Sequence, residues 1–132
     1  MKNITGKQMK VLLKAQQAEL NAVVMYQKMA DRIENPEIAA GLREIAQDEG
    51  RHAAAFRKLT QKTLTPKNSL ANMVVFMMKV VGEKMLFPII ARREYAAINS
   101  YDPVVKDFPE LIDVQQDEGR HGDRISELVK ML

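Results

Sequence analysis

Apolar residues recur along this chain in steps of three and four, in stretches separated by short polar or proline-containing breaks. Such steps keep residues on one face of an α-helix, whereas a half-buried strand would alternate at every second residue. No alternating stretch lies between the breaks. The pattern therefore predicts an all-α fold, with four amphipathic helices at residues 12–33, 38–59, 87–101 and 111–128.

The breaks predict where the helices begin. Thr5 before a glycine is a candidate helix start, and Asn35 is a candidate N-cap because Pro36 follows it at the first helical position. The sequence around Pro66 predicts a connector, and Asp102 is a candidate cap for a later helix. Short turns within the first and the last pair of helices predict a four-helix bundle.

Two parts of the chain resemble each other. The six residues QDEGRH occur at 47–52 and again at 116–121, and the two copies end in the two histidines of the chain. The stretches before them also match, because a Glu-Ala-Tyr pattern of identical spacing begins at Glu19 and at Glu94. A helix hairpin that occurs twice explains both matches.

We predict that residues 1–132 form one domain built from these two halves, at about 5–61 and about 88–131. Residues 62–87 join the halves and are rich in Met, Val and Phe, which predicts a helix that is apolar over a wide face. This joint is either a helical crossover that returns the chain to the correct end of the bundle, or the first part of a long helix kinked near Pro88.

Composition excludes several classes of protein. Cys is absent, which rules out disulfides, zinc–thiolate sites and iron–sulfur clusters and agrees with the cytoplasmic location that we expect. The net charge is +3, with basic and acidic residues interspersed and no basic patch with interleaved aromatic residues, so we expect no nucleic-acid partner. Charged residues interrupt the most apolar stretch, residues 70–90, so we expect no membrane span.

Each predicted helix carries a glutamate, or a glutamate and a histidine, in the middle of its apolar face. Burying an unpaired carboxylate costs several kcal/mol, and carboxylates buried in one layer repel one another. A domain is stable by only about 5–15 kcal/mol, so this layer needs compensating positive charge. Two metal ions would supply it, and this set of oxygen and nitrogen ligands suits iron or manganese. The candidate ligands are Glu19, Glu49, His52, Glu94, Glu118 and His121.

The spacing of these residues supports a dinuclear site. A Glu and a His three residues apart lie on one helix face and can reach the same ion. One Glu from each of two helices, with Glu-x-x-His from each of the other two, is the arrangement of dinuclear ferritin-like bundles. The alternative is a bundle whose buried polar residues are bridged by water without any metal.

Six further residues are candidates for holding the ligands in place. A metal-bound imidazole usually donates its second N–H to a carboxylate, which the neighbouring aspartates can provide with arginines orienting them. The tyrosines lie two turns beyond their glutamates and can hydrogen-bond a ligand carboxylate. Solvated surface pairs and core aromatic residues are the alternatives for these positions, which are Tyr26, Asp48, Arg51, Tyr101, Asp117 and Arg120.

The paired DEGRH motifs and the Glu-x6-Tyr pairs resemble the ferritin-like superfamily, and most closely its rubrerythrin-like di-iron proteins. The resemblance covers residues 8–61 and 88–130. It implies that the six candidate ligands hold two iron ions. It also implies reduction of hydrogen peroxide by the diferrous site, a role in oxidative stress, and a homodimer, in some members formed by swapping helix pairs.

The chain departs from the rubrerythrin pattern in two ways. Family members typically carry an additional Glu three residues after the first Glu of the third helix, where this chain has Ala97. The site then resembles the plain six-ligand form of other di-iron carboxylate proteins. Classical rubrerythrins also have a Cys-ligated rubredoxin domain, and since Cys is absent here, we expect electrons to come from a separate donor.

The leading interpretation is therefore a non-haem di-iron oxidoreductase that reduces hydrogen peroxide or dioxygen. One alternative is a di-iron hydroxylase of the demethoxyubiquinone type, which a substrate-sized apolar pocket would favour over a small tyrosine-lined site. Another is iron sequestration or storage without catalysis. The apolar stretch 70–90 is a candidate homodimer surface in the first interpretation and a quinone or membrane-surface face in the hydroxylase.

Overall fold

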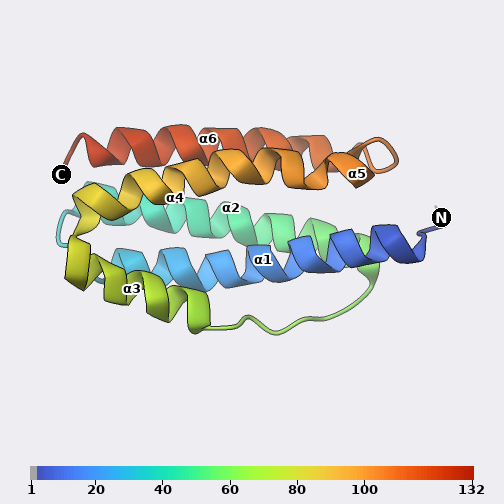
Figure 1. Ribbon diagram of the computed structural model, residues 1–132, viewed down its shortest axis with the longest axis horizontal. Helices are drawn as coiled ribbons and strands as arrows, with labels where there is room; N and C mark the ends of the chain where they lie inside the picture. The colour runs from blue at the N-terminus through green and yellow to red at the C-terminus, as the bar shows by residue number, and fades with distance from the viewer. Residues whose placement is uncertain (1–2) are drawn as a thin grey trace.

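Four long helices lie side by side with their axes along a common direction (Figure 1). The computed structural model describes residues 3–132, and the regular structure in this range is entirely helical. The elements are α1 (Gly6–Asp31), α2 (Pro36–Thr60), α3 (Ser69–Val81), α4 (Glu83–Ala97), the 3₁₀-helix η1 (Ile98–Tyr101), α5 (Asp102–Val105) and α6 (Leu111–Val129). Helices α1, α2, α4 and α6 form the bundle, which confirms the predicted all-α, ferritin-like architecture.

The first hairpin begins and turns where the sequence predicts. The Thr5 hydroxyl accepts a hydrogen bond from the Gln8 backbone N–H at 3.1 Å, and the Gln8 side chain accepts one from the Thr5 backbone N–H at 3.0 Å. This reciprocal capping box satisfies two N–H groups that a helix start leaves without partners. At the start of α2, the Asn35 side chain accepts from the backbone N–H groups of Glu37 and Ile38, with Pro36 in the first turn.

The joint between the halves contains a crossover. Residues 61–68 run back along the bundle from the end of α2, and α3 then packs on α1 (Figure 1). Helix α4 can therefore start at the end of the bundle where α2 starts, and the two helices are parallel (Figure 1). The alternative of a kink near Pro88 is wrong, because Pro88 lies inside α4 and the chain breaks at Gly82. Gly82 has φ 84°, a conformation that costs glycine little and other residues more.

The end of α4 also differs from the prediction. The third helix was expected to continue to residue 101, but residues 98–101 tighten into the 3₁₀-helix η1. Asp102 does not cap the following turn, because it is itself the first residue of α5 and no side-chain cap forms there. Its carboxylate instead accepts a hydrogen bond from Gln115 Nε2 of α6 at 3.1 Å. This contact ties the segment after α4 to the last helix.

Two apolar clusters occupy the two ends of the bundle, with a polar layer between them. One cluster contains Met29, Leu42 and Phe87, and the other contains Phe56 and Phe108. Buried apolar surface stabilises a fold by roughly 25 cal/mol per Å². The two clusters therefore offset the free-energy cost of burying the polar layer. Within residues 3–132, no helix combines the length and the apolar character that crossing a bilayer requires.

Candidate metal centre

The six predicted ligands meet in the polar layer between the two apolar clusters. Helices α1 and α4 contribute one glutamate each, while α2 and α6 each contribute a glutamate and a histidine one turn apart. All six side chains come from helix interiors, so their positions follow from the packing of the four helices. Their residues expose between 2% and 6% of their surface and are Glu19, Glu49, His52, Glu94, Glu118 and His121.

These residues form two adjacent groups, each able to surround one metal ion. Glu19 and His52 belong to one group, and Glu94 and His121 belong to the other. Glu49 and Glu118 belong to both groups, and within each group the ligand atoms lie within 4.8 Å of one another. Two positions that share two carboxylates are the arrangement of a dinuclear centre in which the shared carboxylates bridge the ions.

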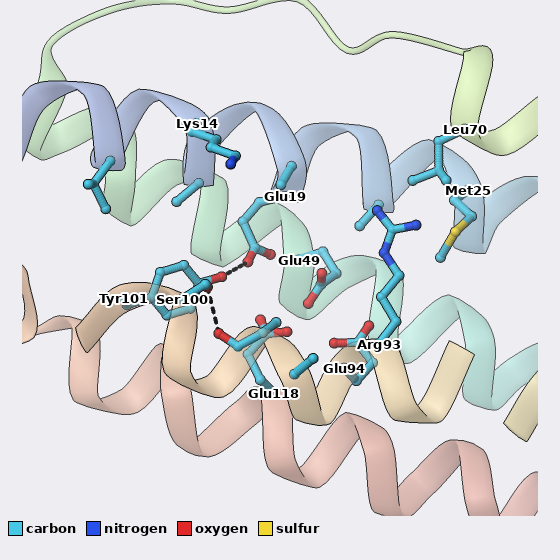
Figure 2. Close-up of a pocket in the computed structure, with 16 residues that line it drawn as sticks. Lys14, Glu19, Met25, Glu49, Leu70, Arg93, Glu94, Ser100, Tyr101 and Glu118 are labelled. Carbon is cyan, nitrogen blue, oxygen red and sulfur yellow. Dashed lines mark hydrogen bonds between the residues drawn. The ribbon is translucent and has the colours of Figure 1, made fainter. Parts of the chain in front are cut away.

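Each tyrosine reaches across to the glutamate of the other half of the chain. The Tyr101 hydroxyl donates to Glu19 Oε1 at 2.7 Å (Figure 2), and the Tyr26 hydroxyl donates to Glu94 Oε1. Burial and the adjacent carboxylates raise the pKa of both phenols well above 10, so both remain protonated donors. The two unshared glutamates are therefore each held by one phenol.

The aspartates cross between the halves in the same way. His52 Nε2 lies 2.7 Å from Asp117 Oδ2, and His121 Nε2 lies 2.9 Å from Asp48 Oδ2. A carboxylate accepts only, so Nε2 carries the proton and donates in both contacts. The two Nδ1 atoms then face the glutamates, with the rings stacked at a centroid distance of 5.7 Å. The aspartates thus orient both imidazoles with Nδ1 toward the layer.

An arginine pairs with each of these aspartates at the surface. Arg51 pairs with Asp48 on α2, and Arg120 pairs with Asp117 on α6, each three residues away along its helix. Both arginine side chains are about two thirds exposed, and exposed pairs of this kind contribute little to stability. Their effect is local, because each guanidinium contacts the aspartate that accepts from an imidazole.

Three buried atoms of the layer test whether metal ions fit there. Among residues 3–132, Glu49 Oε1, Glu118 Oε1 and His121 Nδ1 are buried polar side-chain atoms that have no hydrogen-bond partner. His121 Nδ1 lies 3.0 Å from Glu49 Oε1, but the geometry is not that of a hydrogen bond. When Nε2 carries the proton, Nδ1 and the carboxylate oxygens are all acceptors, and facing acceptors need a cation between them. The donor set therefore fits bound metal.

The pKa values show how strongly the layer attracts positive charge. Burial, with the Glu118 carboxyl and the charge of Glu49, raises the pKa of Glu94 to about 10. Burial also raises the pKa of Glu19 to about 7, although His52 opposes the shift. Burial lowers the pKa of His52, but the surrounding carboxylates outweigh it and raise the value to about 11. Without metal, the layer therefore retains protons in positions where metal ions would bind.

The layer opens to a cavity between α1 and α4. The cavity has a volume of about 440 Å³, and the four glutamates of the layer line it while the two histidines do not. Figure 2 shows the carboxylates of Glu19, Glu49 and Glu94 gathered between the helices. Ala97, at the position of the additional glutamate in the family pattern, also lines the cavity. A small molecule can thus approach the layer from the carboxylate side.

Several residues around the layer gave no signal in the sequence. Lys14 and Arg93 line the cavity, but surface cations at these positions follow no motif. Gly122 lies against the ring of Tyr95, where an added Cβ would come within 2.6 Å of Tyr95 Cε1. A glycine next to a histidine motif could only have been interpreted by knowing which side chain faces it.

The fold and the layer define the class of the protein: a ferritin-like bundle with buried glutamate and histidine groups arranged for a dinuclear metal site. The family model for Rubrerythrin matches residues 10–129, which is nearly the whole chain. The chain therefore belongs to the rubrerythrin family. Neither curated proteins nor solved structures gave a match to this chain.

Proposed function

We propose that the protein is a di-iron oxidoreductase that reduces hydrogen peroxide, or dioxygen, with electrons from a separate donor. The observation that carries this proposal is the pair of buried ligand groups that share Glu49 and Glu118. Members of the rubrerythrin family are typically di-iron peroxidases, which favours iron over manganese and peroxide over other oxidants. The proposed ligands are the six residues of the layer: Glu19, Glu49, His52, Glu94, Glu118 and His121.

The bound iron pair would supply the electrons for reduction, and the chain's own residues would set the conditions. Asp48 and Asp117 keep the imidazoles oriented with Nδ1 toward the glutamates of the layer, where each Nδ1 could bind a metal ion. Tyr26 and Tyr101 each hold one oxygen of an unshared glutamate, and the second oxygen of Glu19 lies 3.3 Å from His52 Nδ1. The Tyr101 hydroxyl also lines the cavity and holds a proton there, where oxygen reduction consumes protons.

Ala97 stands where the family pattern has an additional glutamate, and this difference affects how the site would work. An additional glutamate at this position would reach into the cavity beside the layer, because Ala97 lines that cavity. Alanine leaves the space free and provides no ligand. We propose that the six residues of the layer would hold the iron ions without a further carboxylate, and that the oxidant approaches through the space beside Ala97.

The size of the cavity favours a second candidate function. At about 440 Å³ the cavity is within the range of sites for small organic ligands, about 300–1,000 Å³. A hydroxylase of the demethoxyubiquinone type needs a pocket of this kind beside its di-iron site. Transfer of labelled oxygen from dioxygen into an organic product would support hydroxylation. Reduction of peroxide to water without such a product would support the first proposal.

The surface provides a candidate interface for a homodimer. Five large apolar side chains of α3 and α4 are at least half exposed, and a soluble monomer rarely leaves so many together. We propose that a second copy covers this face, either by simple contact or with swapped helix pairs. The exposed residues are Met73, Phe76, Val80, Met85 and Ile89.

We place the protein in the cytoplasm. The absence of Cys suits this reducing compartment.

Reaction of the loaded protein tests the proposed function. The protein would be loaded with Fe(II) without oxygen and mixed rapidly with hydrogen peroxide or with dioxygen, and oxidation would be followed by absorbance. We expect peroxide to oxidise the bound iron faster than dioxygen does, and to leave it able to react again after reduction. Oxidation of bound iron no faster than that of free Fe(II) in the same buffer would contradict the proposal.

A further inference from the structure

The cavity beside the glutamate layer is much larger than hydrogen peroxide requires. A water molecule occupies about 30 Å³ in the liquid, and hydrogen peroxide has one oxygen atom more. The volume of about 440 Å³ exceeds this need several-fold. The excess volume points to an occupant with an organic part.

Away from the glutamates, much of the cavity wall consists of small apolar side chains. Ala18 and Ala22 of α1 face it, together with Ala97 of α4. Met25 and Leu70 extend the apolar wall at one end. Alanines on both sides leave the space between α1 and α4 open. Such a wall suits an alkyl chain.

Two cations that border the cavity have no side-chain partner among residues 3–132. Lys14 and Arg93 are exposed residues that line it, and their side chains form no hydrogen bond or ion pair with residues 3–132. Figure 2 shows the Arg93 side chain extending from α4 toward α1, across the space between the helices. Arg51 and Arg120, in contrast, each pair with an aspartate. The free cations favour a ligand with an anionic group.

We propose that the cavity binds an organic hydroperoxide that carries an anionic group, such as a carboxylate, at the other end of an alkyl chain. The hydroperoxide lies at the glutamate layer, the chain lies along Ala18, Ala22 and Ala97, and the anionic group lies between Lys14 and Arg93. A neutral quinone would leave both cations without a partner. This inference rests on the proposed peroxide reduction and names its substrate class.

The reduction balances with the electron donor already required. The O–O bond of one hydroperoxide breaks, and two electrons and two protons convert it to one alcohol and one water. A metal pair held by the six residues of the layer would supply the two electrons, and an external one-electron donor, such as a reduced redox protein, would restore them in two steps. The protons come from solvent through the open cavity, which Tyr101 also lines.

Equilibrium binding tests the inference without turnover. Octanesulfonate is a suitable probe because it is anionic, has an alkyl chain and coordinates metal ions poorly, and octanol is its neutral counterpart. Calorimetry on the iron-loaded, oxidised protein should show one octanesulfonate site per chain. The double variant Lys14→Gln, Arg93→Gln should weaken octanesulfonate roughly five- to tenfold and octanol hardly at all, since partly exposed ion pairs contribute modestly.

Matched controls separate this site from general effects of charge or volume. Arg92→Gln removes an exposed cation next to Arg93 that does not line the cavity, and it should leave octanesulfonate affinity unchanged. Ala18→Leu fills the cavity and should weaken both probes, whereas Ala54→Leu at an exposed position of α2 should weaken neither. Equal affinity in all four proteins and the parent would mean non-specific binding and would overturn the inference.

Reaction rates separate the failure of this inference from the failure of the proposed function. The parent should react with ω-hydroperoxyoctanoate faster than with neutral octyl hydroperoxide, and the ratio should fall about five- to tenfold in Lys14→Gln, Arg93→Gln. Equal rates for the two organic hydroperoxides, with hydrogen peroxide still reduced, would overturn the inference alone. Failure of all three oxidants to oxidise the bound iron would overturn the proposed function as well.

Discussion

Asp117 accepts from His52 of the other half of the chain, and Asp48 accepts in the same way from His121. At the scale of single residues, each half therefore depends on the other for the orientation of its imidazole. The same holds for the phenols, since Tyr101 holds Glu19 and Tyr26 holds Glu94. A change at one of these partners should act on a ligand 65 to 82 residues away in the sequence, not on its sequence neighbours.

Replacement of Asp117 tests this dependence. Asp117→Asn removes the charge that fixes the Nε2 proton of His52, and loss of such a partner typically lowers metal affinity about 10- to 100-fold. Titration against a competing chelator would measure the change. Asp113→Asn, at an exposed position of the same helix, should leave the affinity unchanged. Equal affinity in both variants would show that the aspartate does not orient a metal ligand.

The protonation of the layer predicts an unusual pH dependence for the metal-free protein. The folded pKa values of Glu94, about 10, and Glu19, about 7, lie above the ordinary 4.5, and that of His52, about 11, lies above 6.5. Between these ordinary values and the raised ones, the folded state binds more protons than the unfolded state. The free energy of unfolding therefore decreases as pH rises from about 4.5 toward 10.

Thermal unfolding at several pH values would measure this effect. The chelator-treated protein should lose Tm steadily above about pH 5. The metal-loaded protein should lose much less, because metal ions take the place of the protons and metal binding near pH 7 releases protons. A metal-free protein whose Tm rises between pH 5 and 8 would contradict the raised pKa values.

At the scale of the helices, two glycines of the repeated motif region differ in what surrounds them. An added Cβ at Gly50, inside α2, would have Val23 Cγ2 as its nearest neighbour at 4.0 Å. An added Cβ at Gly122, inside α6, would come within 2.6 Å of the Tyr95 ring. The Tyr95 hydroxyl on α4 also donates a hydrogen bond to Asp123, the residue after Gly122 on α6. Gly122 therefore permits close packing of α4 on α6, whereas Gly50 is not needed for space.

Alanine substitution should distinguish the two positions. Gly50→Ala should stabilise the protein by about 0.5–1 kcal/mol, because glycine is unfavourable in a helix interior. Gly122→Ala should destabilise it, since the Tyr95 ring must move away and lose its contact with Asp123. Urea unfolding of the metal-free proteins would measure both free energies. Stabilisation by both substitutions would show that Tyr95 does not pack tightly on α6.

The helix boundaries were predictable from the sequence where nearby residues alone determine them. The Thr5 and Asn35 caps and the Pro66 connector are all present, because capping needs only nearby residues. The kink considered at Pro88 and the cap predicted at Asp102 were wrong, because tertiary packing determines the local structure there. A kink at Pro88 was one of the two alternatives for the joint, but Gly82 takes the positive φ, and Asp102 hydrogen-bonds to α6 instead of capping its own turn.

The candidate site was also predictable only in part. The sequence spacing alone predicted that the six residues of the layer lie on helix faces that meet. The structure places these residues in two groups. Spacing did not reveal which glutamates both groups share, or that the aspartates and tyrosines cross between halves. These relations depend on how α1, α2, α4 and α6 pack. The division of the chain into two repeated halves stays a prediction.

For the whole molecule, the exposed apolar residues of α3 and α4 predict self-association. Phe76 exposes 62% of its surface, and its neighbours Met73 and Val80 on α3 are similarly exposed. Phe76→Asp places a charge in this face and should convert a dimer to a monomer in sedimentation velocity, with little loss of helix content. Lys79→Asp would test whether charge alone has this effect. A parent protein that is monomeric at high concentration would contradict the interface.

The central claim is that the buried layer holds two metal ions. Elemental analysis of the purified protein after Fe(II) loading would test it most directly, with Glu49→Gln as the variant and Glu44→Gln, at an exposed position of α2, as its control. We predict two iron ions per chain in the parent and the control, and loss of both ions in Glu49→Gln because Glu49 belongs to both groups. No bound metal in the parent, or equal metal in all three proteins, would contradict the claim.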